Sequence, residues 1–191
     1  MTEPTARERL LTAAVEAFAE RGFHATTTRD IAARAGMSPA AVYVHHESKE
    51  SLLYSVSLSG HNDALAVIRK AAESSDDPVL RVRAMVHDFT YWHAINSRVG
   101  RIVQYEFFAL SVDHRKEIGL LRREIEREMR AALRDGVADG VFQIDDIPGT
   151  ALALLSLGVD LVRWFQPGGN RSATDLADLN AHLALRIVGA A

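Results

Sequence analysis

Residues 27–53 read TTRDIAARAGMSPAAVYVHHESKESLL and carry the clearest structural signals in the chain. Thr27 and Asp30 form a capping-box pattern, which predicts that a helix begins here. Gly36 can adopt a positive φ at little cost, so it predicts the end of that helix after about two turns.

A second short helix is predicted directly after this turn. Ser38 can cap its first N–H groups, and Pro39 suits the first helical position because its missing N–H costs nothing there. We expect this helix to end near His46. Two short helices joined by a tight turn are typical of a helix-turn-helix, whose second helix fits the major groove of DNA.

The second helix is predicted to have one buried face and one open face. Val42 is the expected core residue. The open face carries small side chains, at Pro39, Ala40, Ala41 and Val44. Polar-tipped side chains flank it, at Tyr43, His45 and His46. Such a surface could approach base edges closely and contact phosphates.

Lys49 is predicted to lie in the first turn of the next helix, where the helix dipole is positive. A cation costs about 0.3–1 kcal/mol at that position. A bound phosphate would reverse the cost, because the free N–H groups and the ammonium would both face an anion. We therefore expect Lys49 to contact a phosphate.

Helical signals continue through the rest of the chain, without alternating strand patterns or repeats. Helices are predicted at about residues 5–21, 48–74, 79–96, 99–110, 112–139, 147–165 and 173–188. With the two short helices, the predicted fold is all-α with about nine helices.

The bulk composition is typical of a globular protein, with 48% hydrophobic and 25% charged residues among 191. The absence of cysteine excludes disulfides, thiolate metal sites and a cysteine nucleophile. Residues 1–9 are polar, unlike a signal peptide, and the uncharged apolar run at residues 147–159 is too short to span a bilayer. We therefore expect a cytoplasmic protein with no membrane partner.

The charge balance gives no general support for nucleic-acid binding. The net charge is −3, and the first 55 residues carry six Lys or Arg against seven Asp or Glu. DNA binding must therefore depend on where individual charges lie rather than on their total.

Aromatic residues gather in two consecutive predicted helices, at Phe89, Tyr91, Trp92, Tyr105, Phe107 and Phe108. They fill an ordinary core or line an apolar pocket, and the sequence leaves both open. In the pocket interpretation, the ligand-binding residues are Tyr91, Trp92, Tyr105 and Phe108. Arginines near in sequence would offer phosphate partners at its mouth, at Arg98, Arg101, Arg115 and Arg122.

A homodimer is predicted from the last two helices. Residues 147–165 are apolar on almost every side, so this helix needs cover on more than one face. The last helix carries an apolar stripe, at Leu176, Leu179, Leu183 and Ile187. Two such helices from each subunit would form a four-helix interface.

Residues 27–53 resemble the DNA-binding domain of the TetR family of bacterial repressors, with the signature T-x-x-x-I-A-x-x-A-G-x-S-x-x-x-x-Y-x-H-x-x-S-K-x-x-L. The resemblance implies a three-helix, homeodomain-like helix-turn-helix domain over residues 1–48. It implies a helical ligand-binding and dimerisation domain over residues 49–191. Separately, the sequence leads us to expect no catalytic site, no metal and no cofactor.

The same resemblance implies a set of DNA-binding residues: Thr27, Thr28, Arg29, Ser38, Pro39, Ala40, Ala41, Tyr43, Val44, His45 and Lys49. Among them Tyr43 and Lys49 would clamp phosphates, and Arg29 would reach a base. Two departures stand out, His46 where the family usually has Phe and Val44 where a polar or aromatic residue is common. With few hydrogen-bonding readers, specificity would depend on Arg29, thymine methyl groups and DNA shape.

Residues 114–118, 135–142 and 164–169 resemble the ligand domain of TetR-type regulators of fatty-acid and steroid catabolism, several of which respond to acyl-CoA thioesters. This resemblance implies a repressor that a small apolar effector, such as an acyl-CoA, releases from a palindromic double-stranded DNA operator. An unrelated drug-like hydrophobic ligand is the alternative effector.

Other classes of function are weighed against this one. No nucleophile–base pair and no metal-ligand spacing is recognisable, and adjacent His45 and His46 diverge by about 100° on a helix, so we expect no enzyme. A small-molecule receptor that has lost DNA binding, and an activator in place of a repressor, both stay open.

Overall fold

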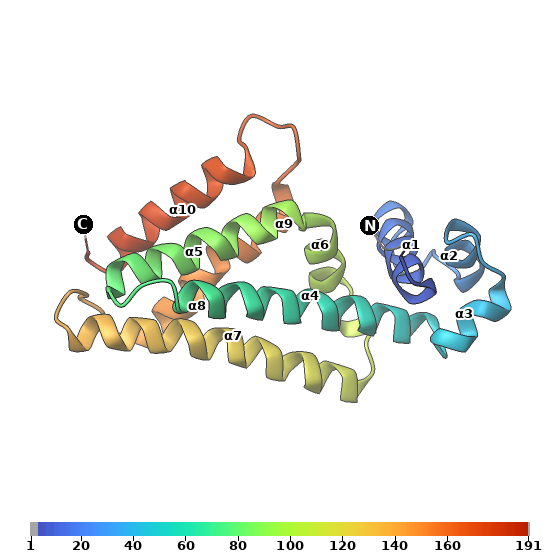
Figure 1. Cartoon of the computed structure of the whole chain (residues 1–191), viewed down its shortest axis with the longest axis horizontal. Coiled ribbons are helices and arrows are strands. Elements are labelled where there is room, and N and C mark those ends of the chain that lie inside the picture. Colours follow the sequence, from blue (N-terminus) through green and yellow to red (C-terminus); the bar gives the residue numbers. More distant parts are fainter. Residues whose placement is uncertain (1–3, 191) are drawn as a thin grey trace. The chain divides into compact units, whose positions relative to one another are not determined.

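The computed structural model describes residues 4–190, which contain ten α-helices and one 3-10 helix but no strand (Figure 1). The helices are α1 (Ala6–Arg21), α2 (Thr28–Arg34), α3 (Pro39–His45), α4 (Lys49–Ala72), α5 (Pro78–Ile95), α6 (Ser97–Tyr105), η1 (Phe107–Ala109), α7 (Val112–Ala138), α8 (Ile147–Val159), α9 (Leu161–Trp164) and α10 (Ala173–Ile187). The all-α prediction is confirmed. The tenth helix arises because the predicted helix at 147–165 is interrupted at Asp160, which ends α8 before α9 begins.

Contacts divide the chain into two compact units. The first comprises residues 4–60 and 98–118, and the second comprises residues 61–97 and 119–190. Both α4 and α7 contribute residues to each unit. This division does not coincide with the predicted domain boundary after residue 48, which remains a prediction about function.

In the first unit, α1 packs on α2 and α2 packs on α3. Thr5 and Glu8 form a capping box that begins α1. Gly22 ends the helix with φ +78°, a conformation that only glycine adopts without strain. The Thr26 hydroxyl then donates to the Gly22 carbonyl at 2.7 Å, which closes the turn leading into α2.

The second unit has a continuous apolar core drawn from α4, α5, α7, α8 and α10. α10 lies along α5 (Figure 1), and the buried residues of α10 include three small ones, Ala177, Ala181 and Ala184. On α8, a Cβ at Gly158 would lie 3.0 Å from the Phe89 ring, so glycine permits the close approach of α5. Packing of small residues therefore sets the spacing of these three helices.

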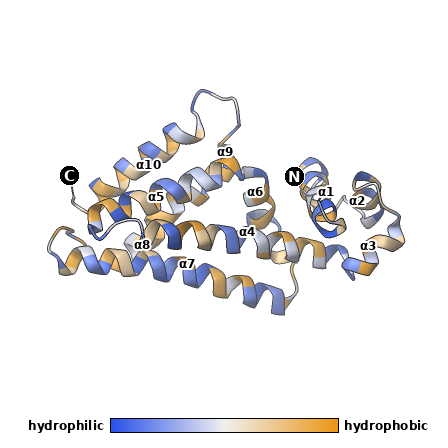
Figure 2. Ribbon diagram, viewed as in Figure 1, coloured by the Kyte–Doolittle hydropathy of each residue, from blue (hydrophilic) through white to orange (hydrophobic). Residues whose placement is uncertain are grey.

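One stretch, Ile147–Trp164, is long and apolar enough to cross a membrane when length and composition alone are considered. It comprises α8 and α9, and α9 is coloured as hydrophobic in Figure 2. Because 33% of the stretch is buried inside the protein, it behaves partly as a core helix. Its large apolar residues that stay exposed are Leu152 and Trp164.

Candidate nucleic-acid interface

The first helix of the predicted helix-turn-helix is fixed by its own cap. The Asp30 carboxylate accepts from the Thr27 N–H at 2.8 Å and from its hydroxyl at 2.7 Å, while Thr27 Oγ1 accepts from Asp30 N–H at 3.2 Å. These hydrogen bonds lower the pKa of Asp30, because they favour the charged carboxylate. The predicted capping box is therefore present, and the Thr27 side chain serves the cap.

The turn and the start of α3 also follow the sequence prediction. Gly36 has φ +66°, and Met37 N–H donates to the Ala32 carbonyl at 2.9 Å. Ser38 Oγ accepts from the Ala41 N–H at 3.2 Å, and Pro39 occupies the first helical turn. Ser38 thus acts on α3 as its N-cap.

The open face of α3 is exposed as predicted, and its core residue is buried. Val42 is 0% exposed, whereas Tyr43 is 55% and Val44 80% exposed. The other predicted contact residues of α3 are exposed or half-buried, at Pro39, Ala40, Ala41 and His45. An 80% exposed valine on a short, capped helix buries little apolar surface within the chain, so its side chain is available to a partner.

Thr28 and Tyr43, fifteen residues apart, are brought together by the turn. Their hydroxyl oxygens lie 3.1 Å apart and share a hydrogen bond. Beside Thr28, the Arg29 side chain is exposed and forms no ion pair with any residue that the structure describes. The beginning of α2 and the exposed face of α3 therefore present two hydroxyls and a guanidinium that can contact a nucleic-acid backbone.

Lys49 lies where the sequence predicts, but its ammonium is already engaged. Nζ donates to the carbonyls of Phe23 at 2.7 Å, His24 at 3.2 Å and Thr26 at 2.8 Å. It also lies 4.4 Å from the centre of the Phe23 ring. All three donors are used, so in this conformation Lys49 holds the α1–α2 turn against the start of α4. Its predicted phosphate contact stays a prediction.

His46 stands where the resemblance would place Phe, and the structure explains how a histidine fits this position. Its side chain is buried, and burial lowers its pKa, so the imidazole is held neutral. Nε2 is buried with no hydrogen-bond partner among residues 4–190. A neutral ring therefore fills the interior position where the resemblance would place Phe.

A polar cluster that the sequence did not reveal joins α4 to the beginning of α7 within the first unit. The Tyr54 ring stacks on His114 with 3.7 Å between ring centres, and the Tyr54 hydroxyl donates to Glu117. Glu50 accepts from the Ser111 N–H at 2.8 Å and contacts His114 Nδ1 at 2.7 Å. The bond to Glu117 raises the pKa of Tyr54 to about 12.

This cluster fixes the first turns of α4, next to Lys49, through residues some sixty positions away. It contains carboxylates and a histidine. Even so, no group of three His, Cys, Asp or Glu side chains that could hold a metal occurs in the described part of the chain. The hydrogen bonds and ring stacking of the cluster hold the first turns of α4 against the beginning of α7.

The four predicted ligand-binding aromatics are divided between the units. Tyr91 and Trp92 belong to the second unit, and Tyr105 and Phe108 to the first. Phe108 is 83% exposed, and Tyr91 and Tyr105 are also exposed, while Trp92 packs partly against the core. Their assignment to a ligand pocket remains a prediction.

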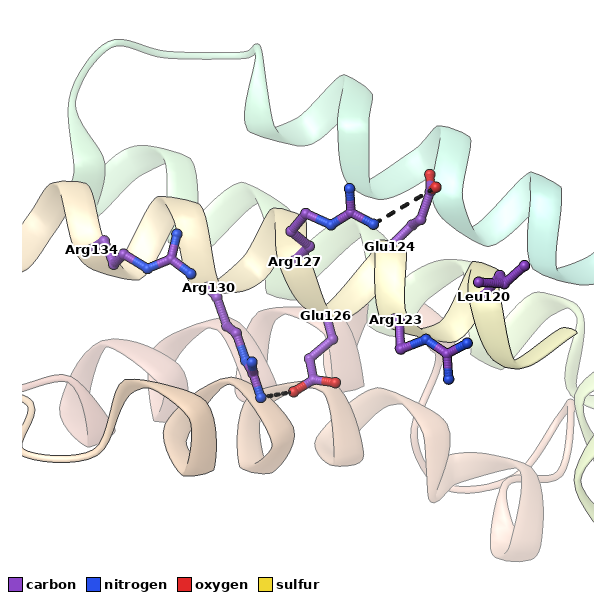
Figure 3. A pocket seen from close by; sticks show the side chains of 7 residues that line it. All are labelled: Leu120, Arg123, Glu124, Glu126, Arg127, Arg130 and Arg134. Carbon is purple, nitrogen blue, oxygen red and sulfur yellow. Dashed lines mark ion pairs between the residues drawn. The ribbon is translucent and has the colours of Figure 1, made fainter. Parts of the chain in front are cut away.

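Two of the arginines predicted at the pocket mouth have internal partners. Arg115 donates to the Phe108 carbonyl at 3.2 Å and the Leu110 carbonyl at 2.6 Å, which closes the turn before α7. Arg122 Nε donates to His61 Nε2 at 3.0 Å, and burial lowers the pKa of Arg122. A cavity of about 420 Å³ lies elsewhere, on α7 (Figure 3).

Comparisons with known proteins agree with this arrangement. Residues 10–56 match the model of bacterial regulatory proteins of the tetR family, and residues 75–188 match the tetracyclin repressor-like C-terminal domain. The repressor KstR2 of Rhodococcus jostii is 31% identical over 175 residues, which cover 90% of this chain and 85% of KstR2.

Solved structures show the same fold. A tetR-family regulatory protein from Rhodococcus RHA1 has a TM-score of 0.93 and 40% identity, covering 98% of this chain and 99% of that one. The ketosteroid transcriptional regulator KstR2 of Mycobacterium tuberculosis has a TM-score of 0.86 and 26% identity, covering 97% and 95%. The chain therefore belongs to the TetR family of bacterial regulatory proteins, and it is a DNA-binding transcriptional regulator rather than an enzyme.

Proposed function

We propose that this TetR-family protein is a homodimeric repressor that binds a pseudo-palindromic DNA operator and is released by a small apolar effector, an acyl-CoA thioester in particular. The observation that carries the proposal is the exposed face of α3, with Tyr43 linked to Thr28 and Val44 open to solvent. The KstR2 relatives support repression, since KstR2 of Rhodococcus jostii is named a transcriptional repressor.

The exposed groups divide into two proposed roles. Tyr43 and Thr28 contact the phosphates of any sequence, because hydroxyl donors to phosphate carry no base information. Arg29 reaches a base edge, and Ala40 and Val44 contact thymine methyl groups. This division leaves much of the specificity to apolar contact and DNA shape.

The proposed dimer uses α8 and α10 of each subunit. Leu176 is buried within its own subunit, but Leu179 and Ile187 of the same stripe are exposed. On α8 and α9, Leu152 and Trp164 are exposed as well. These outward apolar residues are what a second copy would cover, and a two-fold dimer would present two α3 helices to the half-sites of a palindrome.

The effector class rests on the resemblance of the C-terminal helices and on the KstR2 relatives, one of which is named a ketosteroid regulator. Trp92, half-buried at the edge of the core in the second unit, is the aromatic residue best placed to cover an apolar group. Acyl-CoA thioesters and the chromosome both occur in the bacterial cytoplasm, where we place the protein. A drug-like hydrophobic molecule is the second candidate effector.

Release from DNA requires that the effector bind one conformer better than another, because equal affinity for both would shift nothing. We propose α4 as the element that carries the change. It begins beside α3 at Lys49, contributes to both units, and ends in the core that holds Trp92.

The test is a titration of a preformed protein–DNA complex with acyl-CoA thioesters of varied chain and ring structure, with free acids and CoA alone as controls. We expect at least one thioester to weaken DNA binding roughly tenfold or more, a typical coupling. If no thioester acts and an unrelated hydrophobic drug does, the effector class is wrong. Sedimentation that shows a monomer would contradict the proposed dimer.

A further inference from the structure

The cavity on α7 is lined mainly by charged side chains, which have no role in the proposed function. It has a volume of about 420 Å³, within the range of about 300–1,000 Å³ that is usual for ligand sites. Its lining comes from α7 alone, at Leu120, Arg123, Glu124, Glu126, Arg127, Arg130 and Arg134, all within the second unit. We call it the arginine groove (Figure 3).

The carboxylates of the arginine groove do not balance its guanidinium groups. Glu126 pairs with Arg130, and Glu124 lies 3.8 Å from Arg127. Glu124 is shared, however, because Arg69 of α4 donates to it at 2.6 Å. The remaining lining arginines, Arg123 and Arg134, form no ion pair with any described residue. The groove therefore carries an excess of positive charge.

Helical spacing makes this charge continuous. Leu120, Arg127 and Arg134 are seven residues apart and form one row, and Arg123 and Arg130 form a second row beside it. Arg123 and Arg127 are four residues apart, as are Arg130 and Arg134, a spacing at which like charges destabilise a helix. An anion in the groove would relieve this repulsion.

We propose that the arginine groove binds an extended, multiply phosphorylated ligand, of the kind formed by the diphosphate and ribose phosphate of a nucleotide coenzyme. Arginine is the side chain best suited to phosphate, because its planar guanidinium can donate two parallel hydrogen bonds. The row from Arg123 to Arg134 is about 17 Å long. This length exceeds the Debye length of about 8 Å at physiological salt. A compact anion bound at one end of the row is therefore largely screened from the arginines at the other end.

Two sources can supply such a ligand, the CoA part of the proposed effector or a free nucleotide. Leu120, 56% exposed at one end of the groove, offers an apolar contact that favours CoA with its pantetheine arm. The inference stands without the proposed function, since it concerns binding to α7 and not release from DNA.

The experiment is isothermal titration of the full-length protein with CoA, ATP and inorganic pyrophosphate at one salt concentration. The variant Arg123→Gln/Arg134→Gln removes two exposed guanidiniums, so it should fold normally. Lys70→Gln is the matched control, because Lys70 is an exposed cation on α4 outside the groove. We expect the double variant to bind CoA about tenfold or more weakly, with Lys70→Gln unchanged.

The ligands separate the two sources. Tighter binding of CoA than of ATP assigns the groove to the coenzyme, equal binding assigns it to nucleotides in general, and both should exceed pyrophosphate. Absence of CoA and ATP binding, or equal CoA binding by the double variant, would overturn the inference. So would a loss of DNA affinity in the double variant with CoA binding intact, since the groove would then be a DNA surface. A thioester that releases DNA equally well from both proteins would leave the proposed function standing while the groove fails.

Discussion

The helix-turn-helix of the first unit and the helical core of the second unit are built on different principles. In the first, Thr27, Gly36 and Ser38 set the helix ends by bonds within a few residues, and Tyr43 and Val44 on the open face of α3 stay exposed. In the second, α5, α8 and α10 meet through side chains far apart in sequence, such as Asn180, which donates to the Leu157 carbonyl at 3.0 Å. The comparison teaches that the helix-turn-helix is specified locally, whereas the core of the second unit depends on the packing of the whole unit.

The largest expected effect is on the free energy of unfolding, and it tests the packed core of the second unit. Leu133 is 0% exposed in the core of the second unit, and Leu120 lies exposed on the same helix. Leu133→Ala should lower the free energy of unfolding by about 2–5 kcal/mol, because it removes buried apolar contacts and leaves a cavity. Leu120→Ala, the matched control, should change it by less than about 1 kcal/mol. Chemical denaturation measures both, and equal losses would contradict the assigned core.

The next effect concerns pH. His93 is buried, its Nδ1–H donates to the Phe89 carbonyl at 2.8 Å, and burial lowers its pKa to about 4, with His61 contributing. The unfolded chain therefore takes up a proton at this residue near pH 6.5, before the folded protein does. Stability should fall as the pH drops from about 6.5 towards 4, by about 3 kcal/mol in total.

The variant His93→Gln should remove most of this pH dependence, and the exposed His182→Gln should retain it. Denaturation midpoints of both variants, measured at several pH values, would show whether His93 causes the pH dependence of stability. An unchanged slope in His93→Gln would show that another group, such as buried His46, is responsible.

A smaller effect on stability is expected at Lys49, and it tests the helix-turn-helix of the first unit. Loss of the three carbonyl bonds in Lys49→Ala should destabilise the first unit by about 1.5–3 kcal/mol, as for hydrogen bonds to charged groups. Hydrogen exchange should show faster opening of the α1–α2 turn. DNA affinity should fall alike for all sequences, because the helices are less well positioned.

The salt dependence separates the two roles of Lys49. A positioning role leaves the slope of affinity against salt unchanged, whereas a lost phosphate contact lowers it by about one unit. A lower slope together with unchanged hydrogen exchange would restore the phosphate clamp as its main role.

The sequence predicted the local features because their causes lie close together in the chain. The capping box at Thr27, the positive φ of Gly36 and the burial of Val42 needed only the neighbouring residues. The bonds of Lys49 to carbonyls 23–26 positions away, and the contact of Glu50 with His114, depend on the fold and have no local pattern. For the same reason, residue spacing could not show whether the aromatics of α5 and α6 lie in one unit.

The most direct test of the account is selection of duplexes from a random DNA library by the full-length protein. Affinities of the selected and scrambled duplexes are then measured at one salt concentration. The account predicts a pseudo-palindromic sequence bound about 10³-fold or more tightly than the scrambled duplex. Equal affinity for selected and scrambled DNA, or a selected site without two-fold symmetry, would contradict it.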